Sequence, residues 1–176
     1  MNKKLILSFA IAVVMLVSCN NQIETKNDDI NLADSISHYE KLLYSGKPKV
    51  DSGDAMKLAD FYQYYAIENE NDSLSPEYLF KAADINMNMN QPKRSIICFT
   101  ILLEKYPYFE KSPTALFLKA FVYENQLLDY VNAEKYYKLF LNQYPDSDFV
   151  DDAEISLKNM GKTPEELIEE FEKMNK

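Results

Sequence analysis

The 176-residue sequence is poor in residue types that several classes of protein require. Three Gly and seven Pro are too few for a collagen-like or loop-dominated disordered chain. Two Cys and one His do not suffice for a disulfide framework or a zinc cluster. A net charge of −9 argues against nucleic acid as a partner, because that backbone requires a basic surface. The sequence is nevertheless 47% hydrophobic and 13% aromatic, enough to bury the core of one domain.

Residues 1–18 have the pattern of a secretory signal peptide. Lys3 and Lys4 precede an apolar run over residues 5–17, and the small residue Ser18 follows. This run is shorter than the about 20 residues that a membrane-spanning helix needs. We therefore set residues 1–18 aside before considering the fold.

The segment ends in Leu16-Val17-Ser18-Cys19, which resembles the lipobox of bacterial lipoproteins. In that family the cysteine thiol is diacylated, the peptide is cut before it, and the new amino terminus is acylated. The resemblance implies a covalent lipid on Cys19, with acyl chains that contribute about 0.8 kcal/mol per buried methylene. The alternative is an ordinary secretory peptide with a chance cysteine at its end.

The polar residues that follow Cys19 predict a flexible tether over residues 19–33. In proteobacterial lipoproteins an Asp next to the cysteine favours retention in the inner membrane, so Asn20 is compatible with sorting to the outer membrane. Surface-exported lipoproteins carry an acidic cluster close to the cysteine, whereas Asp28 and Asp29 lie further along. The resemblance thus implies a lipid anchor in the outer membrane, on its periplasmic face.

From about residue 34 onward the hydrophobic pattern is helical, and no stretch alternates with the period of a strand. Residues 54–68, for example, carry Leu58, Phe61, Tyr62 and Tyr65 on one face. Ser75-Pro76, Ser112-Pro113 and Thr163-Pro164 predict an N-cap followed by a first-turn proline. Glu166 completes a capping box with Thr163. The sequence therefore predicts an all-α fold over residues 34–176.

The Ser-Pro and Tyr-Pro pairs recur at a period of about 37 residues. The residues at large, small and aromatic positions of the two units are Leu79, Ala82, Ala83, Asn86, Ser95, Phe99 and Pro107, then Leu116, Lys119, Ala120, Tyr123, Ala133, Tyr137 and Pro145. This spacing resembles tetratricopeptide repeats. Asn86 replaces an aromatic residue of that pattern, and Lys119 occupies a normally apolar position.

The resemblance implies helical hairpins stacked in a short right-handed superhelix. The best repeats cover residues 75–111 and 112–146, and residues 147–175 form a partial third unit closed by Gly161. The repeat position of residues 54–68, as first or second helix of a hairpin, stays open.

Together, the cysteine, the hairpins and the phrase Tyr144-Pro145-Asp146-Ser147 are similar to lipoproteins of the BamD type and to the YbgF/CpoB repeats associated with the Tol–Pal system. That similarity implies a non-catalytic scaffold in envelope biogenesis, binding a protein or extended peptide of the cell envelope. A surface lipoprotein that binds glycans or nutrients is the alternative. An accessory to an enzyme whose catalytic chain lies elsewhere is a third possibility.

No residue pattern indicates an enzyme, a metal site or a cofactor. His38 lacks a nucleophile elbow, and Cys98 lies in an apolar helical run as a small hydrophobic residue. The acidic pairs Asp151-Asp152 and Glu169-Glu170 point apart on a helix by about 100° and suit solvated faces.

In tetratricopeptide superhelices the first helix of each pair lines the concave groove. The resemblance places ten residues there, namely Glu77, Phe80, Asp84, Met87, Asn88, Thr114, Phe117, Phe121, Glu124 and Asn125. We expect Phe80, Phe117 and Phe121 to face the groove, and its acidic character to favour a neutral or basic segment.

Overall fold

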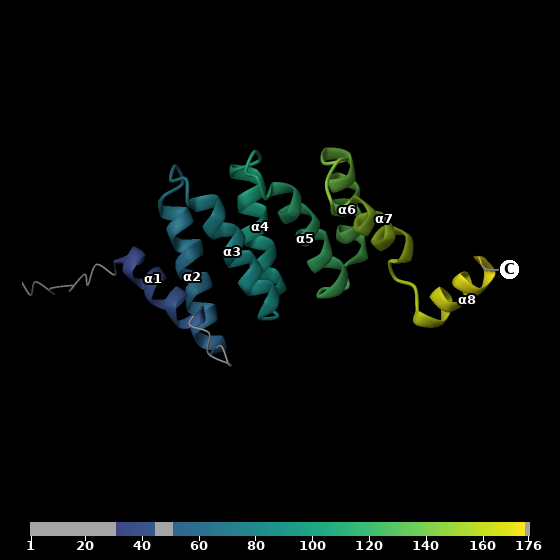
Figure 1. Ribbon diagram of the computed structural model, residues 1–176, viewed down its shortest axis with the longest axis horizontal. Helices are drawn as coiled ribbons and strands as arrows, with labels where there is room; N and C mark the ends of the chain where they lie inside the picture. Colours follow the sequence, from purple (N-terminus) through teal and green to yellow (C-terminus); the bar gives the residue numbers. More distant parts are fainter. Residues whose placement is uncertain (1–30, 45–50, 175–176) are drawn as a thin grey trace, which may run out of the picture.

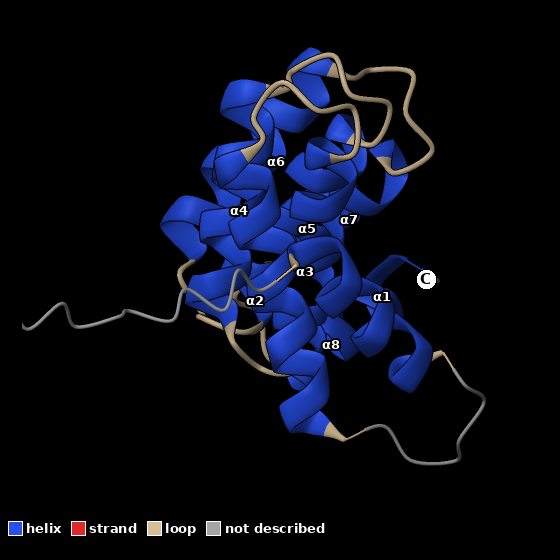
Figure 2. Cartoon of the chain, turned by 90° about the vertical axis from the view of Figure 1, so that its left-hand side faces the viewer, coloured by secondary structure: helices blue, strands red, loops and turns tan. Residues whose placement is uncertain are grey.

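The computed structural model describes residues 31–44 and 51–174, and all secondary structure in these ranges is helical (Figures 1 and 2). The eight helices are α1 (Leu32–Leu43), α2 (Ser52–Glu68), α3 (Ser75–Asn88), α4 (Pro92–Lys105), α5 (Ser112–Asn125), α6 (Tyr130–Gln143), α7 (Val150–Asn159) and α8 (Pro164–Met174). The predicted all-α fold is confirmed. None of the helices in the described ranges has the length and apolar character needed to span a bilayer.

The signal segment, Cys19 and most of the predicted tether lie outside the described residues. The tether was expected to end at residue 33, whereas α1 already begins at Leu32. The Asn31 side chain caps this helix by accepting a hydrogen bond from the Asp34 backbone N–H at 3.3 Å. The cap places the start of the helix two residues earlier than the apolar pattern indicates.

Two of the predicted N-caps are wrong. Leu74 and Lys111 occupy the cap positions of α3 and α5, and Ser75 and Ser112 are already the first helical residues. The Ser75 Oγ donates to the Asn69 carbonyl at 2.6 Å, and the Ser112 Oγ donates to the Tyr106 carbonyl at 3.0 Å. Both serines are buried, so their hydroxyls satisfy the preceding turn instead of the first helical N–H groups.

The predicted capping box at the start of α8 is confirmed. The Thr163 Oγ1 accepts from the Glu166 N–H at 3.2 Å, and the Glu166 Oε2 accepts from the Thr163 N–H at 2.8 Å. Gly161, with a φ of 75°, precedes this box in the turn after α7. That backbone conformation strains any residue with a Cβ, which explains the glycine.

Each helix from α1 to α6 packs against the next one in the chain, and Figure 1 shows α1 to α7 following one another along the long axis of the molecule. α1 pairs with α2, so residues 54–68 belong to the second helix of the first hairpin. The small residues Ala83, Ser95, Ala120 and Ala133 are fully buried. Their size allows the paired helices to approach closely, as the repeat spacing predicts.

The last unit is more open than the two repeats before it. α8 was expected to pack as the partner or cap of α7, but it makes few contacts with the other described helices. Figure 1 shows α8 beyond α7, at the end of the molecule. Two large side chains of this helix, Ile168 and Phe171, are 59% and 60% exposed.

Candidate functional site

The ten residues expected in the groove lie on α3 and α5, the first helices of the two repeats. Phe121 is 36% exposed, and Asn88 and Asn125 are also exposed. Six are half-buried, namely Glu77, Phe80, Asp84, Met87, Thr114 and Glu124. These nine side chains leave an accessible strip along the first helices.

Asn88 and Asn125 occupy equivalent positions in the two repeats and make equivalent contacts. The Asn88 Nδ2 donates to the Asp84 carbonyl at 3.0 Å, and the Asn125 Nδ2 donates to the Phe121 carbonyl at 3.2 Å. Each amide is therefore held against its own helix, four residues back. The same Nδ2 atoms also donate to the carboxylates of Asp84 and Glu124, so the strip presents two exposed amide oxygens one repeat apart as hydrogen-bond acceptors.

The expectation that Phe117 faces the groove is wrong. Its side chain is only 8% exposed and lies in the core formed by α5, α6 and α7. The ring stacks on Phe149 with 4.8 Å between centroids and lies 5.6 and 5.7 Å from the rings of Tyr137 and Phe140. Phe149, the cap residue of α7, closes over Phe117 because the third unit begins there.

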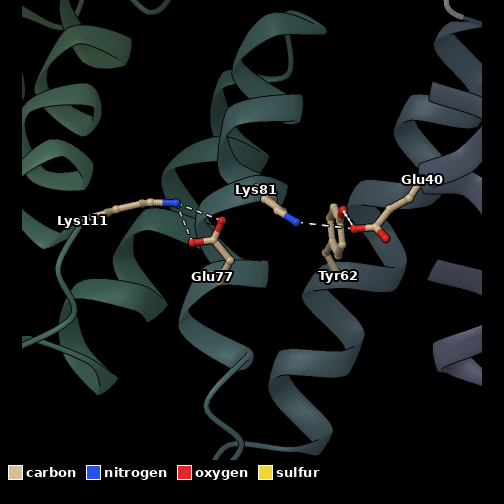
Figure 3. A network of polar contacts seen from close by, with 5 residues as sticks. All are labelled: Glu40, Tyr62, Glu77, Lys81 and Lys111. Atoms are coloured by element: carbon tan, nitrogen blue, oxygen red, sulfur yellow. Dashed lines mark hydrogen bonds and ion pairs between the residues drawn. The ribbon is translucent and has the colours of Figure 1, made fainter. Parts of the chain in front are cut away.

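Lys111 contacts two residues of the strip, Glu77 and Phe80, and the repeat pattern does not indicate these contacts. Its Nζ lies 2.7 and 2.9 Å from the two Glu77 carboxylate oxygens (Figure 3). The same Nζ lies 5.3 Å from the centroid of Phe80. The Lys111 ammonium thereby balances the charge of the Glu77 carboxylate. The Phe80 ring packs edge-on against the Phe99 ring. Glu77 and Phe80 are consequently engaged by Lys111, the cap residue of α5, and by Phe99 on α4 rather than standing free for a ligand.

A second polar cluster joins α1, α2 and α3. The Glu40 Oε1 accepts from the Tyr62 hydroxyl at 2.6 Å and from the Lys81 Nζ at 3.4 Å (Figure 3). Lys81 also lies 5.3 Å from the centroid of Tyr62. Burial, followed by the hydrogen bond to Glu40, raises the pKa of Tyr62 well above its ordinary value. The cluster fixes the first hairpin against the first repeat.

The open part of the strip has an acidic character. Burial raises the pKa of Asp84, and the hydrogen bond from Asn88 acts in the opposite direction. Glu124 accepts a hydrogen bond from the Tyr137 hydroxyl at 2.8 Å. Neither Asp84 nor Glu124 pairs with a cation among the ion pairs of residues 31–44 and 51–174.

His38 and Cys98, the two residues weighed as reactive groups, take part in packing. The His38 ring packs edge-on against Tyr39 with 5.1 Å between centroids. Cys98 is fully buried, and burial raises the pKa of its thiol to about 12. Across the described parts of the chain, no three His, Cys, Asp or Glu side chains gather in a way that could hold a metal ion.

Comparison with protein families follows the same division of the chain. Residues 77–107 and 114–147 match the model of the tetratricopeptide repeat. These segments cover most of the α3/α4 and α5/α6 hairpins, so this part of the chain consists of two tetratricopeptide repeats. Such repeats are protein-interaction modules and are typically non-catalytic. No curated protein matches the sequence significantly.

Proposed function

We propose that this protein is a non-catalytic scaffold of the bacterial cell envelope that binds an extended segment of a partner protein along α3 and α5. The observation that carries the proposal is the pair of equivalent amides at Asn88 and Asn125. Both N–H groups of each amide bond within its own helix, so its oxygen remains as an acceptor for the backbone N–H groups of a peptide. Two such acceptors one repeat apart suit a segment that lies along the stack.

Side chains beside the two amides supply the remaining recognition. Phe121 is 36% exposed and Met87 is half-buried, so both offer apolar area to an extended segment. Asp84 and Glu124 add negative charge on a chain whose net charge is −9. This combination favours a neutral or basic partner segment and disfavours an acidic one.

The proposal is tested by crosslinking in cells, purification of the full chain through a carboxyl-terminal tag, and mass spectrometry. Replacing both amides, Asn88→Ala with Asn125→Ala, should weaken partner binding about thirtyfold and lower recovery accordingly, because two hydrogen bonds of about 1 kcal/mol each are lost. Asn142→Ala, at an exposed position on α6, is the matched control and should retain the partner. Equal recovery from wild type and the double variant would contradict binding along the strip.

The location that we propose is the periplasmic face of the outer membrane, with the chain held by lipid on Cys19. Its support is the lipobox-like Leu16-Val17-Ser18-Cys19 after a signal-like segment. Cys19→Ala should move the protein from the membrane fraction to the soluble fraction and remove envelope proteins from the crosslinked set. Retention of Cys19→Ala in the outer membrane would contradict the anchor, while leaving the test of the strip intact.

A further inference from the structure

A pocket of about 500 Å³ opens among α4, α5 and α6, with α4 and α6 being the second helices of the two repeats. Three leucines and three tyrosines contribute to its wall, namely Leu103, Leu116, Leu139, Tyr108, Tyr136 and Tyr144. Its volume lies in the range of small-ligand sites, and its wall is largely apolar and aromatic.

Lys119 gives this pocket a buried cation. The residue is only 5% exposed, and its side chain lines the pocket. The Nζ lies 4.2 Å from the centroid of the Tyr136 ring, and the Nζ of Lys135 lies 5.1 Å from the same centroid. Within residues 31–44 and 51–174, no carboxylate forms an ion pair with Lys119.

The Lys119 ammonium lies at the pocket wall, where the Tyr136 ring face replaces only part of its hydration and no carboxylate of the described residues balances its charge. A ligand anion that entered the pocket would therefore gain a strong charge-assisted hydrogen bond. The single ammonium favours a monoanion over a phosphate dianion, which needs several donors and would be repelled by the net charge of −9. Glu104 also lines the pocket, but it is exposed and its charge is screened by water.

We propose that this pocket binds a carboxylate carried on an apolar or aromatic body, with the carboxylate on the Lys119 Nζ and the body against the leucines and tyrosines. The carboxylate can belong to a free organic acid or to the last residue of a peptide chain, and the chemistry is the same. The pocket is separate from the strip on α3 and α5. Lys119 comes two residues before Phe121, which places the two side chains about 160° apart around α5.

The direct test uses fluorine NMR of a fluorinated phenylpropionate with the full chain. Its primary amide has the same shape without the charge. The acid should bind at least about tenfold more tightly than the amide, since a hydrogen bond between charged groups contributes more than a neutral one. Equal affinities, or no binding of the acid, would overturn the proposal on the wild-type protein alone.

Variants then assign the effect to the cation. Lys119→Met keeps the length of the side chain and should remove the preference for the acid, whereas Lys93→Met, at an exposed position on α4, should keep it. Circular dichroism checks that both variants retain their helices. A preference that survives in Lys119→Met would overturn the assignment.

A peptide arm distinguishes the two sources of the carboxylate. A short peptide ending in Phe with a free carboxylate competes with the fluorinated acid if the pocket accepts chain ends, and the same peptide with a carboxamide should compete at least about tenfold less. Competition by the free-acid peptide supports the proposal and identifies a chain terminus. Binding of the small acid without peptide competition supports it and identifies an organic acid.

Discussion

At the scale of single residues, two buried tyrosines connect the helices of their hairpins in the same way. Tyr62 on α2 donates to Glu40 on α1 at 2.6 Å, and Tyr137 on α6 donates to Glu124 on α5 at 2.8 Å. Both side chains are fully buried, and burial is the main cause that raises the pKa of each. The hydroxyl thus stays protonated and acts as a donor to a carboxylate inside the stack.

Tyr62→Phe should lower the free energy of unfolding by about 1–2 kcal/mol, because the Glu40 carboxylate loses a charge-assisted hydrogen bond. Urea denaturation followed by circular dichroism measures the change. Tyr64→Phe is the matched control, since Tyr64 lies on the same helix and is 56% exposed. A loss as large in Tyr64→Phe would show that the hydroxyl contact is not responsible.

The raised pKa of Tyr62 predicts that the stability of the folded protein depends on pH in the alkaline range. The folded-state pKa of Tyr62 is raised above its ordinary value of 10.0, so the unfolded chain loses this proton first. The stabilisation from Tyr62 is fully present below pH 10 and is lost as the pH rises further. The wild-type protein should therefore lose stability between about pH 9 and 11 more steeply than Tyr62→Phe. Parallel pH curves for the two proteins would contradict this account.

Cys98 should resist alkylation in the folded protein. With a pKa of about 12, only about one thiol in ten thousand is ionised at pH 8, and the side chain is fully buried. Labelling with iodoacetamide, mapped by mass spectrometry to the Cys98 peptide, should be slow in buffer and fast in urea. Comparable labelling under the two conditions would show that the α4 core opens readily.

The repeat pattern predicts the backbone better than it predicts single contacts. The positions of the small residues and first-turn prolines indicated the hairpins, because these requirements are local in the sequence. The burial of Phe117 depends on Phe149 of the next unit, and the neutralisation of Glu77 depends on Lys111. Each contact joins a first helix to the cap residue of the next first helix, and periodicity within one repeat carries no signal for it.

At the scale of elements, α8 differs from the helices before it. The Thr163–Glu166 capping box and an ion pair of Lys162 with Glu170 support it locally. It makes few contacts with the other described helices, so tertiary burial contributes little to its stability. The capping box was predictable from four consecutive residues, whereas the divergence of the helix was not.

Hydrogen exchange should therefore separate α8 from the stack. We expect the backbone amides of α8 to exchange at least about a hundredfold faster than those of α3 and α5, because local opening of α8 exposes little apolar surface. Mass spectrometry of peptic fragments after short exposure to deuterium measures the difference. Equal protection of α8 and α5 would show that α8 is docked on the stack.

At the scale of the whole molecule, ion pairs connect the α3/α4 hairpin to the segments that precede and follow it in the stack. The pairs are Arg94–Asp60, Lys105–Glu70, Lys81–Glu40 and Lys111–Glu77. Each is partly exposed and contributes at most about 1 kcal/mol, so the shared core around Leu79 and Phe99 supplies more of the cohesion. The stack thereby offers two separate surfaces, the strip on the first helices and the Lys119 pocket among α4, α5 and α6.

Site-directed photo-crosslinking in cells tests the central claim most directly. The photoreactive residue p-benzoylphenylalanine replaces Phe121 on α5 in one strain and Ile97, an exposed residue on α4, in another. If the first helices bind a partner protein, irradiation should yield a specific adduct from position 121 and none of the same mass from position 97. Adducts from position 97 alone, or the same adduct from both positions, would contradict a binding strip along α3 and α5.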